Sequence, residues 1–130
     1  MTKTAFLFAG QGAQKLGMAR DLYDQYPIVK ETYDQASRVL GYDLRDLIDQ
    51  DEEKLNQTRF TQPAILTTSV AIYRLLVEKG LQPDMVAGLS LGEYSALVAA
   101  GSLDFEDAVA LIAKRGQFME TAAPAGTGKM

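Results

Sequence analysis

The sequence predicts an α/β fold in which parallel strands are flanked by helices. Two short apolar runs, at residues 5–9 and 85–87, each lead into a loop that contains glycine, and the first run indicates a strand buried on both faces. Apolar residues at helical spacing fill much of the chain between and after these runs. Strands that alternate with helices favour a parallel sheet, so we expect strands at residues 4–9 and 85–89 with helices against them.

Composition narrows the possible functions. The 130 residues are 47% hydrophobic and 23% charged, which suits one domain with a real core. A net charge of −4 with scattered basic residues argues against nucleic acid as a partner. The sequence contains no cysteine and no histidine, so the usual thiolate and imidazole metal ligands are missing, as is the usual general base for a serine. We therefore expect neither a metal site nor a nucleic-acid partner.

The apolar run near the start of the chain bears on location. It spans only residues 5–9 before Gly10, which is too short for the core of a signal peptide and far too short to cross a bilayer. We expect a cytoplasmic protein with no membrane partner.

A glycine-rich loop, residues 10–14, follows the first predicted strand. The third glycine of a dinucleotide-binding fingerprint would fall at Lys15, and the Lys-Ser/Thr ending of a P-loop is missing, so both phosphate-binding motifs are excluded. What remains is a loop with exposed backbone N–H groups and the Gln11 amide, at the sheet edge where open α/β folds bind ligands. The alternative, favoured by this loop alone, is a plain turn.

Helical spacing of apolar residues predicts helices over residues 18–26, 27–40, 61–80, 91–100 and from 104 onward. Pro27 suits the first position of the second helix, and Gly41 ends it. Thr61 as a cap, with Pro63 early in the first turn, marks the start of the third helix, whose many apolar positions predict burial on more than one side. Residues 42–59 are charged and predict short, solvated surface helices and turns without chemistry.

The second predicted strand leads into a Gly-x-Ser-x-Gly pattern at residues 88–92, and a helix leaves it. In this arrangement Ser90 can sit on a strained turn with its hydroxyl exposed, because the flanking glycines let strand and helix pack closely. The unpaired N–H groups and the positive dipole end of the following helix would stabilise an oxyanion beside Ser90. Ser90 is therefore a candidate nucleophile. The alternative is that the glycines only shape a turn and Ser90 caps the helix.

The last predicted helix carries a cation within an apolar stripe. At 100° per residue, one stripe holds Ala108, Leu111, Ile112, Arg115 and Met119. Arg115 either reaches the surface or pairs with a buried carboxylate, the commoner fate, or it points into a pocket and holds an acidic ligand through two parallel hydrogen bonds. Its position alone leaves these alternatives open.

Four motifs follow one another along the chain: FLFAGQGAQ at residues 6–14, TQPA at 61–64, GLSLGEYSAL at 88–97 and KRG at 114–116. In this order and spacing they resemble the successive motifs of the malonyl-CoA:acyl carrier protein transacylases, the bacterial acyltransferases of fatty acid synthesis. The resemblance spans nearly the whole chain but only the N-terminal part of such an enzyme. It implies that residues 1–122 belong to a large α/β-hydrolase-like domain, and that residues 123–130 are a linker or truncated end leading to a ferredoxin-like small subdomain that the chain lacks.

The resemblance also implies roles for individual residues. Ser90 would carry the acyl group as an ester, Gln11 and the backbone N–H of Leu91 would form the oxyanion hole, and Arg115 would bind the free carboxylate of the malonyl group. Gln62 would lie near the pocket. The malonyl group would pass from coenzyme A to Ser90 and then to the phosphopantetheine thiol of acyl carrier protein, with no cofactor beyond the coenzyme A thioester substrate. Malonyl-CoA, acyl carrier protein and the remainder of its own large domain are the expected partners.

The sequence departs from the family pattern at two positions. Leu89 stands where the family usually has histidine, which we expect to alter the lining of the pocket, and Ala9 stands where proline is common. The resemblance places the family's catalytic histidine beyond Met130. Because the loss of the base of a serine triad costs several orders of magnitude in rate, we expect residues 1–130 alone to be inactive or nearly so.

Two rival functions share the features of the serine turn. An esterase of the α/β-hydrolase kind predicts no role for Gln11 and no need for Arg115. A non-catalytic interaction module predicts that Ser90 only caps a helix. These rivals differ from a malonyl transferase in acyl preference and in whether Ser90 forms an acyl ester.

Overall fold

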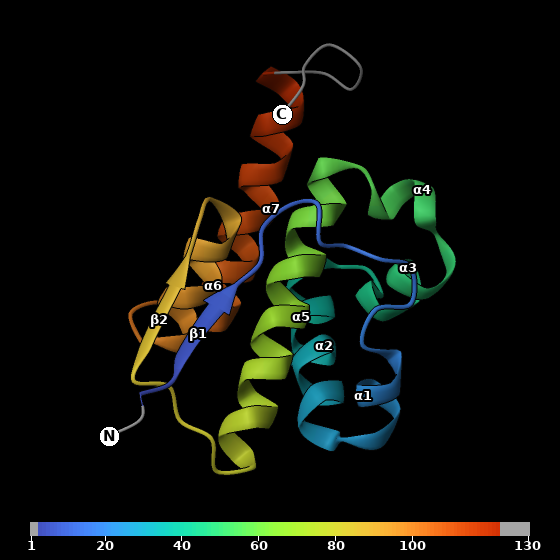
Figure 1. The fold of residues 1–130 in the computed structure, drawn as a ribbon. Coiled ribbons are helices and arrows are strands. Elements are labelled where there is room, and N and C mark those ends of the chain that lie inside the picture. Colours follow the sequence, from blue (N-terminus) through green and yellow to red (C-terminus); the bar gives the residue numbers. More distant parts are fainter. Residues whose placement is uncertain (1–2, 123–130) are drawn as a thin grey trace.

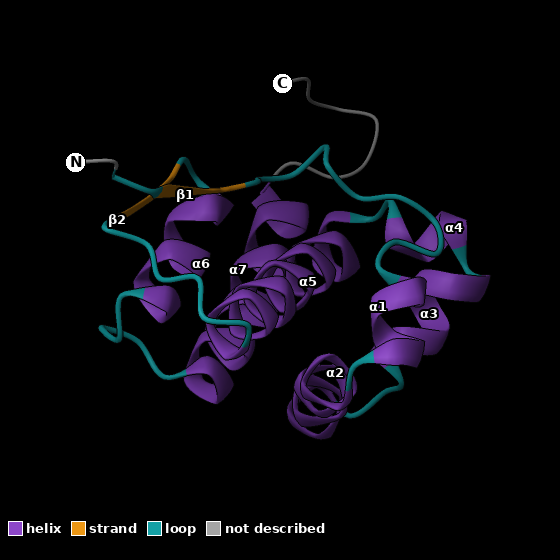
Figure 2. Cartoon of the chain, turned by 60° about the horizontal axis from the view of Figure 1, so that its bottom comes forward, coloured by secondary structure: helices purple, strands orange, loops and turns teal. Residues whose placement is uncertain are grey.

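The computed structural model describes residues 3–122. Within them a small parallel sheet lies against a layer of helices (Figures 1 and 2). The elements in chain order are β1 (Ala5–Phe8), α1 (Arg20–Gln25), α2 (Pro27–Leu40), α3 (Leu44–Gln50), α4 (Glu52–Leu55), α5 (Thr58–Glu78), β2 (Met85–Gly88), α6 (Leu91–Ala99) and α7 (Phe105–Ala122). The α/β architecture with parallel strands is therefore confirmed. The predicted linker at residues 123–130 lies outside the described residues.

The two strands pair in parallel, as predicted, with Ala5 opposite Met85 and Phe8 opposite Gly88. Because both strands run in the same direction, their carboxyl ends lie at the same edge of the sheet. The loop that follows β1 and the turn that follows β2 therefore meet there, although the two strands are separated by five helices.

The outer face of the sheet is exposed in this part of the chain. Leu7 is 81% exposed and Met85 is 55% exposed, whereas Phe6 and Phe8 point inward and pack near the ring of Tyr73. The prediction that the first strand is buried on both faces is therefore wrong for the described residues. The physical reason is that the helices cover only one face of the sheet (Figure 2).

Helix α5 forms the centre of the helical layer and packs against α2, α6 and α7 (Figure 1). Its residues 61–68 are all buried, which confirms the predicted burial on more than one side. Its start differs from the prediction, because the helix begins at Thr58 and Pro63 lies inside it. Thr61 does not cap the helix; its hydroxyl donates to the Gln57 carbonyl at 2.9 Å, within the first turn.

Residues 42–59 form short helices, as predicted, but α3 is not simply a solvated surface helix. It buries Leu44, Leu47 and Ile48 together with Arg45, which is only 4% exposed. The Arg45 guanidinium donates to Asp49 through Nε, at 3.0 Å, and through Nη2. Burial of an unpaired charge is costly, so the pairing with Asp49 allows Arg45 to be buried in this helix.

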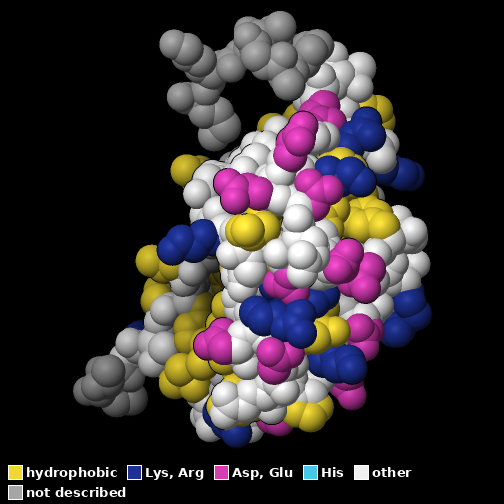
Figure 3. Space-filling view, turned by 90° about the vertical axis from the view of Figure 1, so that its right-hand side faces the viewer, with side chains coloured by type: hydrophobic (Ala, Val, Ile, Leu, Met, Phe, Trp, Pro, Cys, Tyr) yellow, Lys and Arg dark blue, Asp and Glu magenta, His cyan; other side chains and the backbone are white. Residues whose placement is uncertain are grey.

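The surface over α1, α3 and α4 mixes charges of both signs. Figure 3 shows Lys and Arg side chains interspersed with Asp and Glu side chains on this face. Arg20 contributes to this mixture by contacting both Asp24 and Asp49. Among the helices of residues 3–122, the structure shows none that is both long and apolar enough to cross a membrane.

Candidate active site

Ser90 lies on the sharp turn between β2 and α6. Its backbone angles are φ 58° and ψ −119°, in the half of conformational space that residues with a Cβ avoid. Such a conformation costs about 1–3 kcal/mol and persists only where the surrounding structure imposes it. Ser90 occupies the N-cap position of α6, but its side chain makes no capping hydrogen bond. The alternative of a serine that only caps the helix therefore does not describe this turn.

Gly88 and Gly92 allow this turn by close contact between backbones. A Cβ atom on Gly88 would lie 2.1 Å from the Gly92 carbonyl oxygen, and a Cβ atom on Gly92 would lie 2.2 Å from the Phe8 carbonyl oxygen. No side chain fits at either position without displacement of the backbone. The two glycines thus allow α6 to approach both strands closely, and the Ser90 side chain remains exposed at the sheet edge.

The N-terminus of α6 presents backbone donors beside Ser90. Gly92 donates its N–H to the Leu89 carbonyl, and Glu93 donates to the Ser90 carbonyl. The N–H of Leu91, the first residue of the helix, donates no hydrogen bond among residues 3–122. A free N–H at the positive end of a helix dipole is suited to a developing negative charge.

Arg115 reaches Ser90 from α7, 25 positions further along the chain. Its Nη2 donates to Ser90 Oγ at 3.0 Å, and its Nη1 donates to Gln62 Oε1 at 2.7 Å. Its guanidinium carbon lies 5.4 Å from the centre of the Tyr94 ring. Arg115 is half-buried and does not extend freely into solvent. It also forms no ion pair with a carboxylate among the described residues.

The stripe predicted for α7 is only partly correct. Ala108 and Ile112 are buried, but Leu111 is 46% exposed and Met119 is 37% exposed. Gly116 is buried instead, and a Cβ atom there would lie 2.9 Å from the Cα atom of Arg59. This close approach of α7 to the start of α5 brings Arg115 against the helix that carries Gln62.

A chain of amides joins Arg115 to the loop after β1. Gln62 Nε2 donates to Gln11 Oε1 at 3.4 Å and to Met119 Sδ at 2.9 Å, and Gln11 Nε2 donates to Thr58 Oγ1 at 3.1 Å. The Gln11 side-chain amide thus makes a hydrogen bond at each end, whereas its backbone N–H donates no hydrogen bond within residues 3–122. The loop also touches the serine turn, since a Cβ atom on Gly10 would lie 3.4 Å from the Leu89 carbonyl oxygen.

The structure therefore brings together the five residues that the sequence analysis singled out. Ser90, Leu91, Arg115, Gln62 and Gln11 belong to one continuous group at the sheet edge. The alternative that residues 10–14 form a plain turn does not account for the contacts of this loop with Gln62 and with the serine turn. Tyr94 and Thr58 have no expected role in the sequence analysis, yet both contact this group. Tyr94 lies in the motif that follows the serine. Contacts between arginine and an aromatic ring are common in proteins, but the spacing of residues in the sequence does not predict which arginine contacts Tyr94.

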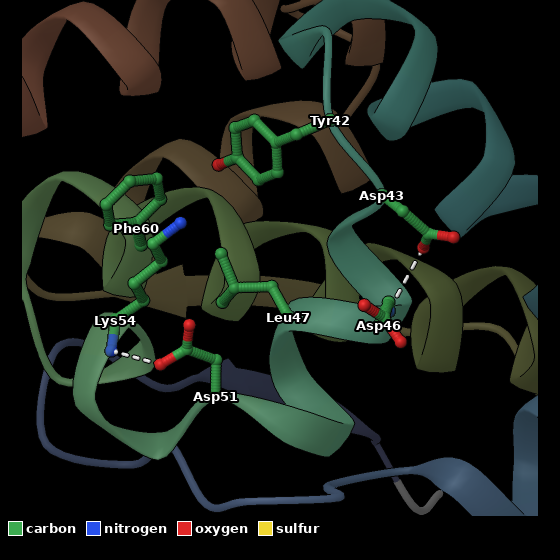
Figure 4. Close-up of a pocket in the computed structure, with 7 residues that line it drawn as sticks. All are labelled: Tyr42, Asp43, Asp46, Leu47, Asp51, Lys54 and Phe60. Carbon is green, nitrogen blue, oxygen red and sulfur yellow. Dashed lines mark hydrogen bonds between the residues drawn. The ribbon is translucent and has the colours of Figure 1, made fainter.

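A separate hollow lies at α3, α4 and the start of α5. It has a volume of about 300 Å³ and is lined by Tyr42, Asp43, Asp46, Leu47, Asp51, Lys54 and Phe60 (Figure 4). Asp43 and Asp51 accept hydrogen bonds from the backbone N–H groups of Asp46 and Lys54, each at 3.0 Å, so they cap the two short helices. Burial raises the pKa of Tyr42 to about 12. None of the residues around Ser90 lines this hollow.

An exposed serine on a strained strand-to-helix turn, with a tight glycine on either side, places the chain among the α/β proteins with parallel strands and a sharp turn at the carboxyl end of a strand. The comparison with protein families is more specific. The chain belongs to the acyl transferase domain family, which matches residues 5–130.

Relatives of known name share this similarity along the whole chain. The chain is 56% identical over 132 residues to the malonyl CoA-acyl carrier protein transacylase of Escherichia coli strain K12, covering 100% of this chain and 43% of that protein. It is 53% identical to the protein of the same name from Bacillus subtilis strain 168, covering 100% of this chain and 41% of that protein. The chain thus spans about two fifths of the length of these relatives.

Solved structures agree with the fold. The crystal structure of MCAT from Streptococcus pneumoniae has a TM-score of 0.93 and 84% sequence identity, and covers 95% of this chain and 40% of that chain. A malonyl-transacylase in complex with its type II PKS acyl-carrier protein has a TM-score of 0.92 and 52% identity, and covers 96% of this chain and 40% of that chain.

Proposed function

We propose that these residues are the N-terminal part of a malonyl-CoA:acyl carrier protein transacylase, which moves a malonyl group from coenzyme A to the phosphopantetheine thiol of acyl carrier protein. The observation that carries this proposal is the 3.0 Å hydrogen bond from Arg115 Nη2 to Ser90 Oγ. In a malonyl thioester only one methylene separates the free carboxylate from the reacting carbonyl. A cation that grips the carboxylate must therefore lie close to the nucleophile, as Arg115 does.

The first half of the reaction forms an ester on Ser90. Its Oγ attacks the thioester carbonyl carbon, the C–S bond breaks, and the thiol of coenzyme A leaves with the proton. In the second half the carrier protein's thiol attacks the ester carbonyl and Ser90 Oγ regains a proton. Arg115 holds the malonyl carboxylate through both halves, so the reacting carbonyl keeps its place beside Ser90.

The negative charge that develops on the carbonyl oxygen needs donors. The Leu91 N–H at the start of α6 supplies one. The backbone N–H of Gln11 supplies the second, because it donates no hydrogen bond within residues 3–122, whereas the side-chain amide of Gln11 donates to Thr58. We therefore assign the oxyanion role expected for Gln11 to its backbone N–H group.

The proton acceptor for Ser90 lies outside this chain, which contains no histidine. We assign residues 1–122 to the large α/β-hydrolase-like domain of the full-length protein, residues 123–130 to a link toward a ferredoxin-like subdomain, and the base to a later segment. The exposed outer sheet face, with Leu7 and Met85, is where the remainder of that domain packs. This chemistry requires no cofactor beyond the coenzyme A thioester that serves as substrate. We place the reaction in the cytoplasm.

Mass spectrometry of the full-length protein tests this function. After mixing with malonyl-CoA, we expect a malonyl adduct on Ser90 and none in Ser90→Ala. The absence of an adduct in the unaltered protein would favour the non-catalytic module. To separate the esterase alternative, Arg115→Ala is compared on malonyl-CoA and on neutral esters: a malonyl transferase loses its preference for the acidic acyl group, whereas an esterase shows no change.

A further inference from the structure

We propose that Gln62 is a positioning residue that aims Arg115 at Ser90 and thereby sets the preference for acyl groups with a free carboxylate. This inference rests on the proposed function and goes beyond it, because it explains what fixes the direction of the carboxylate-binding guanidinium. It depends on three features of Gln62: its burial, its two hydrogen-bonded ends, and its lack of charge.

Gln62 is a polar side chain in the most buried part of the fold. It lies on α5 within residues 61–68, all buried, and is itself 1% exposed. An amide so placed costs free energy unless both of its ends are hydrogen-bonded. Both ends are: Oε1 accepts from Arg115, and Nε2 donates to Gln11 and to Met119.

The guanidinium fixes the orientation of this amide. Arginine only donates hydrogen bonds, so the oxygen of Gln62 must face Arg115 and its nitrogen must face the opposite way. The nitrogen then meets Gln11 Oε1, which turns the Gln11 nitrogen toward Thr58. One donor-only side chain thus sets the direction of two amides, and the carboxylate-binding group is coupled to the loop that carries an oxyanion donor.

Two contacts hold Arg115 from opposite elements. Gln62 Oε1 on α5 accepts from Nη1 at 2.7 Å, and the Tyr94 ring on α6 lies 5.4 Å from the guanidinium carbon. With Nη1 and the guanidinium face occupied, Nη2 is the group directed at Ser90 Oγ. A long, rotatable side chain loses little further freedom on binding substrate when it is already held in this way.

An amide serves this purpose better than a carboxylate. A glutamate at position 62 would form an ion pair with Arg115 and compete with the substrate's carboxylate for the same charge. The neutral oxygen of Gln62 orients the guanidinium and leaves its positive charge uncompensated among the described residues. Loss of the acceptor and gain of a competing charge should therefore both reduce carboxylate preference, for different reasons.

The test compares the full-length protein with Gln62→Met and Gln62→Glu. Methionine keeps the length but cannot orient the guanidinium, and glutamate keeps the acceptor but adds charge. The readout is the ratio of kcat/KM for formation of the Ser90 ester from malonyl-CoA to that from acetyl-CoA. We expect Gln62→Met to lower this ratio by about tenfold to a hundredfold, the range for a hydrogen bond to a charged group, and Gln62→Glu to lower it at least as far. Gln35→Met, a matched change at an amide on α2 remote from Ser90, should leave the ratio unchanged.

A double-mutant cycle separates positioning from a structural role. In an Arg115→Ala background, Gln62→Met should cause no further change in the malonyl-to-acetyl ratio, since there is no guanidinium left to aim. A ratio that Gln62→Met leaves intact, or that it lowers equally with and without Arg115, overturns the inference. If the unaltered protein forms no malonyl ester at Ser90, the proposed function itself fails; if it does form that ester, only the role of Gln62 is in question.

Discussion

A methyl group on Gly88 would lie 2.1 Å from the carbonyl oxygen of Gly92, a residue in the first turn of the following helix. This contact explains why Ser90, between them, adopts a φ of 58°. The chain must reverse direction within a few residues while strand and helix remain in backbone contact. The strained serine and the two side-chain-free glycines are thus consequences of one geometry, and this geometry exposes the hydroxyl.

Gly88→Ala tests this relationship. The added Cβ has no room against backbone atoms, so we expect the full-length protein to lose about 3 kcal/mol of stability or more, measured as the change in urea unfolding monitored by circular dichroism. Gly10→Ala is the matched control, because its Cβ would make an ordinary 3.4 Å contact with Leu89. Equal effects of the two substitutions would show that the contact does not constrain the turn.

Arg115→Lys tests whether the forked guanidinium matters beyond its charge. A lysine retains the positive charge but cannot donate to Gln62 and Ser90 from two fixed nitrogens at once. We expect kcat/KM for malonyl-CoA to fall by about tenfold to a hundredfold, and that for acetyl-CoA to change little, in single-turnover acylation assays. Lys114→Arg, at the exposed neighbouring position, serves as the control and should keep both values.

The contact between Ser90 and Arg115 shows how far sequence reasoning could go. The glycines around Ser90 and the helical spacing around Arg115 identified each residue separately, because each is a local pattern. Their separation of 3.0 Å depends on how α7 packs against α5, and spacing within one helix cannot supply this distance. The resemblance of successive motifs to a family supplied the connection, since it implied that these motifs contribute to one site.

The errors in prediction have a common cause in tertiary packing. Pro63 suggested a helix start, yet α5 begins at Thr58 and continues through the proline, which has no N–H to donate to the carbonyl of Arg59 one turn earlier. The charge of residues 42–59 suggested solvation, yet Arg45 is buried because Asp49 pairs with it. Leu7 is exposed because no described residue covers its face of the sheet.

Asp49→Asn tests the buried ion pair on α3. The Asp49 side chain is 11% exposed and that of Arg45 is 5% exposed, so loss of the charge leaves a buried guanidinium poorly compensated. We expect a loss of about 3 kcal/mol near pH 7 in urea unfolding. Asp24→Asn is the control, because Asp24 makes an exposed pair with Arg20, and such pairs contribute at most about 1 kcal/mol.

The same substitution has a predicted pH dependence. Burial tends to raise the pKa of Asp49, but hydrogen bonds from Arg45 and Arg20 outweigh it, so the pKa lies below the ordinary value. A carboxyl group with a lowered native pKa stabilises the fold above its unfolded pKa, about 3.9, and this contribution is lost as the pH falls through the native pKa. The stability difference between the unaltered protein and Asp49→Asn should therefore shrink below about pH 4. A difference that stays constant there would contradict the assigned pairing.

Residues 1–130 alone provide the last test, because they contain the serine, the helix N-terminus and the guanidinium but no histidine. Arg115 is a hydrogen-bond donor to Ser90 Oγ and cannot accept its proton. With malonyl-CoA and acyl carrier protein, we expect turnover roughly 10⁴ to 10⁶-fold below that of the full-length protein, the range seen when a serine loses its base. Far-UV circular dichroism controls for folding, and sedimentation controls for association through exposed Leu7 and Leu89. A helical, monomeric segment with turnover near the full-length rate would mean that the base lies within these residues, and the assignment of the proton acceptor to a later segment would be wrong.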